Sequence, residues 1–134
     1  MTILFQIANF VALIGWVLML LIPQRRHTLA MIRYGVVLLL ALTYVVLIAP
    51  LLLDFRPDTF STLENVMLLF ADPRTLTAAW VHFLAFDLFV GAHIVEQGIL
   101  IGLKRWQYSL CLPFTFMFGP LGLLMFYGFK LSRG

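Results

Sequence analysis

Four apolar stretches along the chain are each long enough to cross a bilayer. They run over residues 3–22, 34–53, 76–103 and 110–129, and short polar segments separate them. A hydrocarbon core about 30 Å thick needs roughly 20 apolar residues in a helix. The pattern therefore predicts an all-α polytopic membrane protein, with residues 1–134 forming one domain, a bundle of four transmembrane helices.

The segment between the second and third stretches carries a helix signal of its own. Ser61 and Glu64 form a capping-box pattern, and the apolar residues after them fall on one helical face. We expect a short amphipathic helix that lies on the membrane surface, with a lid over the bundle as the less favoured alternative. Asp72 and Pro73 then predict the N-cap and first position of the third stretch.

The composition excludes a soluble globule. Hydrophobic residues make up 63% of the chain and charged residues 11%, whereas a soluble domain is about half apolar and a quarter charged. The net charge of +3 is spread over loops and chain ends, so nucleic acid is not an expected partner. Membrane lipid is expected around the helices, and a homo-oligomer or a larger membrane complex stays open. The first stretch lacks a basic leader and a cleavage site, which indicates an uncleaved helix.

The positive residues of the connections indicate an orientation in the membrane. Cytoplasmic loops are enriched in Lys and Arg. The first and third connections hold five such residues, and the other side holds four. The five are Arg25, Arg26, Arg33, Lys104 and Arg105, and the four are Arg56, Arg74, Lys130 and Arg133. The second connection is also acidic, so we expect both termini outside the cytoplasm, in a bacterial inner membrane.

The third stretch concentrates the chemistry of the chain. It holds His82, Asp87, His93 and Glu96, and ionisable groups inside a bilayer are expensive and by default mark functional sites. Asp87 lies close to the middle of the stretch. On a helix with about 100° per residue, His82 projects about 140° away from Asp87. Asp87 instead shares its face with glycines, which indicate close packing against a neighbouring helix.

Aligning the stretches by depth predicts a polar layer. Asn9 reaches the level of His82, and Tyr44 reaches the level of Asp87. A layer made of Asn9, Tyr44, His82 and Asp87 is therefore geometrically possible, within an error of about one helical turn.

The fourth stretch is predicted to be a broken helix. Pro120 follows Gly119 and cannot donate a backbone hydrogen bond, so the Phe116 carbonyl loses its usual partner. Broken helices persist in lipid where neighbours or a cavity satisfy the freed groups. A kinked, phenylalanine-rich helix beside a few polar groups suits a long apolar ligand with a polar or reactive end.

Each of these features also has a structural explanation. In this alternative, Asp87 and His82 serve solely to hold helices together by hydrogen bonds, and the phenylalanines serve solely as apolar surface facing lipid. His93 and Glu96 have the spacing of two metal ligands, but a pair between Glu96 and Arg33 or Lys104 is favoured. No metal site and no cofactor are expected.

Two runs of the sequence resemble a known family. Residues 79–91, with Trp80, His82 and the triplet Asp87-Leu88-Phe89, resemble the signature of the abscisic-acid-deficient-four family of plants and bacteria. Residues 111–122 resemble its second block. Plant members are needed to make the carotenoid neoxanthin from violaxanthin, which implies an epoxide opening to an allenic alcohol. One group protonates the epoxide oxygen and another removes a ring-adjacent proton. His82 and Asp87 match the motif and are the acid–base candidates.

Two functions follow as hypotheses. The first is a cofactor-free isomerase or related enzyme that binds a carotenoid or another isoprenoid. The residues expected to contact its substrate are Asn9, Tyr44, Trp80, Phe89, Phe116, Gly119 and Pro120. The second is a non-catalytic pigment- or lipid-binding subunit of a larger membrane complex of the photosynthetic type.

Overall fold

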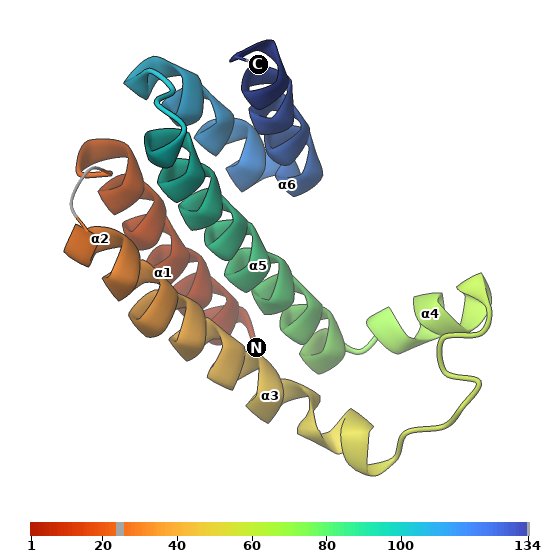
Figure 1. The fold of residues 1–134 in the computed structure, drawn as a ribbon. Coiled ribbons are helices and arrows are strands. Elements are labelled where there is room, and N and C mark those ends of the chain that lie inside the picture. The colour runs from red at the N-terminus through yellow and green to blue at the C-terminus, as the bar shows by residue number, and fades with distance from the viewer. Residues whose placement is uncertain (24–25, 134) are drawn as a thin grey trace.

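The computed structural model describes residues 1–23 and 26–133. Gln24 and Arg25, which belong to the predicted first connection, and Gly134 lie outside the described residues. Every regular element of the described part is a helix (Figure 1). These are α1 (Thr2–Leu21), α2 (Arg26–Met31), the π-helical segment η1 (Ile32–Val37), α3 (Leu38–Leu53), α4 (Leu63–Phe70), α5 (Pro73–Leu100) and α6 (Arg105–Arg133). The all-α prediction is confirmed.

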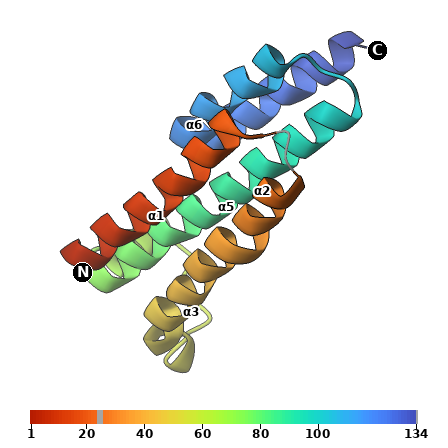
Figure 2. The same cartoon turned by 90° about the vertical axis from the view of Figure 1, so that its left-hand side faces the viewer.

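The long helices have the composition of membrane spans. Four helical stretches, Thr2–Leu21, His27–Leu53, Pro73–Leu100 and Arg105–Arg133, are long and apolar enough to cross a membrane. They indicate an integral membrane protein. Helix α5 is the central one. In its most apolar stretch of 18 residues, 50% of the residues are buried, against 22% to 28% in the other three helical stretches. Figures 1 and 2 show α1, α3 and α6 packed around it.

Glycines on α5 allow close approach by its neighbours. A Cβ on Gly91 would lie 2.7 Å from the Trp16 ring of α1, and a Cβ on Gly98 would lie 3.0 Å from Tyr108 of α6. Side chains at either position would push a neighbouring helix away. The close packing predicted for the glycine face is confirmed.

Helix α6 folds back on itself. Its backbone leaves the helical region at Phe118 (φ −140°, ψ 57°), and the chain then returns along the first half (Figures 1 and 2). The Trp106 and Phe129 rings have centroids only 5.8 Å apart, although 23 residues of straight helix would separate them by about 35 Å. We call residues 105–117 the first arm and residues 119–133 the second arm of this hairpin.

Local chemistry explains the turn. Pro120 has no N–H, so the helical bond to the Phe116 carbonyl cannot form. Gly122 then packs directly on the first arm: a Cβ there would lie 2.5 Å from the Thr115 nitrogen and 2.8 Å from the Cys111 carbonyl oxygen. The arms can touch at this point because residue 122 has no side chain.

The hairpin changes the predicted layout. The sequence predicts one kinked helix over residues 110–129 that crosses the membrane, whereas both ends of α6 lie at the same end of the molecule (Figure 1). The N-terminus and the C-terminus lie at opposite ends of the long helices (Figure 1). The predicted placement of both termini on one side requires four crossings and differs from this arrangement. Hydropathy could not distinguish a hairpin from a single span, because two short apolar arms and one long apolar helix have the same composition.

Arg74 satisfies carbonyl groups inside α3. Pro50 lies within α3 and leaves the Val46 carbonyl without its helical donor. The Arg74 guanidinium at the start of α5 donates to this carbonyl from Nη2 and to the Leu47 carbonyl from Nε, both at 3.0 Å. The contact joins α3 to α5 at the point where Pro50 interrupts the backbone hydrogen bonds of α3.

The helix starts in this region partly follow the prediction. Asp72 caps α5 by accepting from the Thr75 amide at 3.2 Å, with Pro73 in the first turn, as predicted. The predicted cap of α4 is wrong by one residue: Thr62, not Ser61, accepts from the Asn65 amide at 3.1 Å. The Ser61 hydroxyl is engaged elsewhere, because it donates to the Asp58 carbonyl.

Candidate functional site

Asp87 of α5 meets the tip of the α6 hairpin. Its Oδ1 atom occupies the space that a Cβ at residue 119 would need, and its Cγ lies 3.1 Å from that position. The second arm begins at Gly119, and the first N–H groups of a helix have no partner within it. The helix end therefore carries a partial positive charge. The geometry places the one carboxyl group in the middle of α5 at a helix end suited to a negative charge.

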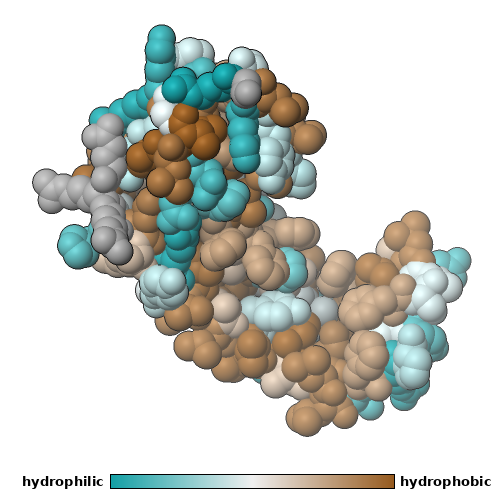
Figure 3. Space-filling model, in the orientation of Figure 1, coloured by the Kyte–Doolittle hydropathy of each residue, from teal (hydrophilic) through white to brown (hydrophobic). Residues whose placement is uncertain are grey.

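A groove surrounds the Asp87 carboxyl. It has a volume of about 480 Å³ and is lined by side chains from both helices. We call it the Asp87 groove; its lining includes Trp80, Phe83, Asp87, Phe116, Phe118, Gly119 and Pro120. Phe83 and Phe118 are 58% and 60% exposed, so the groove opens on the outer surface of the helices. Figure 3 shows one face of the molecule, which is predominantly hydrophobic along the long helices, with most hydrophilic side chains toward the ends.

His82 lies in a different environment. Its ring centroid is 5.6 Å from that of Tyr44 on α3. Together they line two smaller hollows of about 210 and 190 Å³, the second of which also includes Phe89. Asp87 lines neither of these two hollows, whereas Phe83 lines the larger one as well as the Asp87 groove. The helical angle predicted this separation of His82 from Asp87.

Asn9 is held by a tryptophan of α5. The Trp80 Nε1 donates to Asn9 Oδ1 at 2.8 Å, and Trp80 also lines the Asp87 groove. The predicted polar layer is therefore divided in two. Asn9 belongs with the groove through Trp80, and Tyr44 belongs with His82.

The remaining predicted contact residues fall on the same two sides. Phe116, Gly119 and Pro120 line the Asp87 groove, where Phe116 packs edge-on against the buried Trp16 ring at 5.6 Å. Phe89 lies on the His82 side. Sequence reasoning missed Phe83, which borders both sides; its position one residue after His82 was the available signal.

The other ionisable groups of α5 have partners of their own. Arg33 Nη1 donates to Glu96 Oε2 at 2.6 Å, which confirms the predicted pair. The His93 ring faces Phe126 at 6.4 Å. Within residues 1–23 and 26–133, no three His, Cys, Asp or Glu side chains lie close enough together to hold a metal ion.

The fold and the groove define a small helical membrane protein in which a carboxyl group of α5 lies against the tip of a helical hairpin. The family model described as ABA DEFICIENT 4-like matches residues 3–126, and the chain belongs to this ABA4-like family. Neither a curated protein nor a solved structure matches the chain.

Proposed function

We propose that the protein acts in carotenoid or related isoprenoid metabolism and binds a polyene in the Asp87 groove. The observation that carries the proposal is a single carboxyl group in an otherwise largely apolar groove that opens laterally. A lateral opening suits a ligand that is dissolved in the bilayer. Membership of the ABA4-like family supports the same substrate class.

Shape would select the ligand. In lipid the hydrophobic effect gives little preference for a bound apolar molecule, because the acyl chains are equally apolar. Flat rings of Trp80, Phe83 and Phe116 line the groove and offer surfaces that a rigid polyene can match. The polar ring end of the ligand would lie at Asp87, and the chain would extend along α5 and α6.

Asp87 can carry an epoxide isomerisation without a cofactor. The protonated carboxyl donates its proton to the epoxide oxygen while the carbon–oxygen bond breaks. The resulting carboxylate lies at the start of the second arm, where the helix end stabilises negative charge. It then takes the proton that leaves the ring-adjacent carbon, which regenerates the acid and yields an allenic alcohol of unchanged mass.

His82 remains the second candidate from the family motif. It lies on the other side of Phe83, so it reaches the same ring only if the ligand extends around that side chain. We propose that Asp87 carries the proton transfers and that His82 and Tyr44 shape the neighbouring hollow.

We propose three crossings, by α1, by α2–α3 and by α5, with α6 as a re-entrant hairpin. Arg33, Lys104, Arg105, Lys130 and Arg133 then share one end, and Arg56 and Arg74 share the other with four acidic residues. The positive end faces the cytoplasm.

In a bacterial inner membrane the N-terminus is then outside and the C-terminus inside. Helix α4, which has no buried residue, lies on the outer surface.

The test is pigment binding and conversion in a host that makes an epoxycarotenoid. The parent protein is expected to co-purify with pigment and to form an isomer of the same mass, separated by chromatography. Asp87→Asn should retain the pigment and lose conversion by about 100-fold or more, the usual contribution of a general acid or base. His82→Gln should lose less than about tenfold.

Three outcomes would change this proposal. An equal loss in His82→Gln would mean that both groups act on the substrate. Unchanged conversion in Asp87→Asn would remove Asp87 from the mechanism. A parent that neither binds nor alters pigment would favour the non-catalytic membrane subunit instead.

A further inference from the structure

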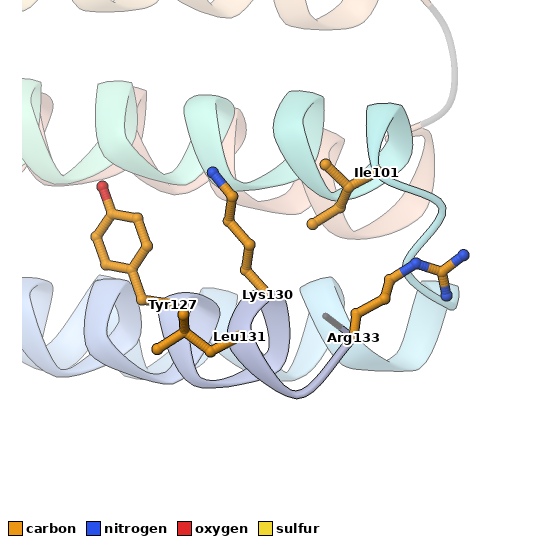
Figure 4. A pocket seen from close by; sticks show the side chains of 5 residues that line it. All are labelled: Ile101, Tyr127, Lys130, Leu131 and Arg133. Atoms are coloured by element: carbon orange, nitrogen blue, oxygen red, sulfur yellow. The ribbon is translucent and has the colours of Figure 1, made fainter.

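The fold-back of α6 creates a further hollow, away from Asp87 and His82. It has a volume of about 760 Å³ and lies between the second arm and the end of α5. Five residues line it, namely Ile101, Tyr127, Lys130, Leu131 and Arg133 (Figure 4). We call it the basic hollow. In Figure 4 the Tyr127 hydroxyl and the Lys130 ammonium both point from the second arm toward α5.

Among the described residues, no acidic side chain forms a salt bridge with the cations of the basic hollow. The one salt bridge of the described residues joins Arg33 to Glu96, so the acidic side chain in the last turns of α5 is already paired. The Arg133 guanidinium lies against Gly102, with Nη2 2.8 Å from the position of a Cβ. Gly102 has a φ of 78°, so the absence of a side chain serves both the turn and the approach of Arg133.

We propose that the basic hollow binds the phosphate group of an anionic phospholipid. Lys130 and Arg133 supply the two positive charges, and the Tyr127 hydroxyl can donate a hydrogen bond to a phosphate oxygen. Ile101 and Leu131 line the same hollow and provide an apolar surface for the first part of an acyl chain. This combination of a cationic head site and an apolar wall matches an amphiphile better than a free phosphate ion.

The site exists only because the helix turns back. In a straight α6, Lys130 and Arg133 would lie about 40 Å from Arg105, on the other side of the membrane. In the hairpin Arg133 lies beside Gly102 and Lys130 lines the hollow with Ile101, at the end where Arg105 begins α6. A lipid held there would bridge the second arm and α5, and would stabilise the closed hairpin. Lipid binding in the basic hollow does not depend on the carotenoid reaction.

The test compares two double variants with the same loss of charge. The first, Lys130→Gln with Arg133→Gln, removes both cations of the basic hollow. The control, Lys104→Gln with Arg56→Gln, removes two exposed cations that do not line it. Purified proteins in detergent are titrated with short-chain phosphatidylglycerol, with phosphatidylcholine of the same chain length, and with inorganic phosphate, and thermal unfolding is followed.

The parent and the control should be stabilised by phosphatidylglycerol at about thirtyfold lower concentration than by phosphatidylcholine, since each of the two basic residues adds about 1 kcal/mol to anionic lipid binding. The first double variant should lose this preference and keep the unfolding temperature of the lipid-free parent. An equal loss in the control would overturn the site in favour of general charge. Displacement of phosphatidylglycerol by millimolar inorganic phosphate would overturn the lipid as its occupant.

Discussion

The Asp87 carboxyl of α5 fills the space beside Gly119 that any other side chain at residue 119 would occupy. The contact joins the two elements of the Asp87 groove at one point. It holds the tip of the hairpin against the middle of α5, and it places the start of the second arm next to the Asp87 carboxyl. The shape of the hairpin and the position of the candidate catalytic group therefore depend on each other.

Gly119→Ala should destabilise the protein, because its Cβ would collide with Asp87 Oδ1. Overpacking of this kind costs about 1–3 kcal/mol. Gly128→Ala is the matched control on the same arm, where a Cβ would meet nothing within 4 Å. It should leave the unfolding temperature unchanged or raise it, since Ala favours helix over Gly by about 1 kcal/mol. Equal unfolding temperatures for the two variants would contradict the contact.

Asp87→Asn should fold normally, and Asp87→Leu should not. Asn keeps the shape of the side chain and can accept hydrogen bonds from the start of the second arm. Leu has no polar atom to offer there, and its branched end would press on the hairpin tip. We expect the Leu variant to be less stable than the Asn variant by about 2 kcal/mol or more, measured by thermal unfolding in detergent. Matching stabilities would show that Asp87 has no structural role.

Arg74→Gln should weaken the packing of α3 on α5 by about 1–2 kcal/mol, because two carbonyl groups lose a charged donor. The loss should shrink in a Pro50→Ala background, where residue 50 regains an N–H for the Val46 carbonyl. A double-mutant cycle measures this coupling. Independent, additive effects would mean that Arg74 does not compensate for the proline.

Labelling of single cysteines tests the hairpin in the membrane. In a Cys111→Ala background, Ser132→Cys should react with an impermeant maleimide from the same side as Lys104→Cys. Ser61→Cys, at the start of the α4 region, should react from the opposite side. All three positions are exposed in the structure. If Ser132→Cys reacts together with Ser61→Cys, α6 crosses the membrane as a single straight helix.

Local patterns in the sequence were enough to predict several elements. The lengths of the apolar stretches predicted the long helices, and Asp72 with Pro73 predicted the start of α5. The helical angle between His82 and Asp87 predicted that they face different ways, and the charges of Arg33 and Glu96 predicted their pairing. Each of these depends on neighbours in the chain, on the period of a helix, or on the high cost of an unpaired charge in lipid.

Tertiary contacts decided the rest. Pro120 shows where α6 is weak, but a proline can produce a mild kink or a complete reversal. Which of these occurs depends on how closely the arms approach, and that is set by Gly122 against Thr115 and by Gly119 against Asp87. Other tertiary contacts divide the predicted polar layer: Trp80 donates a hydrogen bond to Asn9, and Tyr44 packs against His82. Hydropathy does not distinguish a hairpin from a straight span, because both contain the same apolar residues.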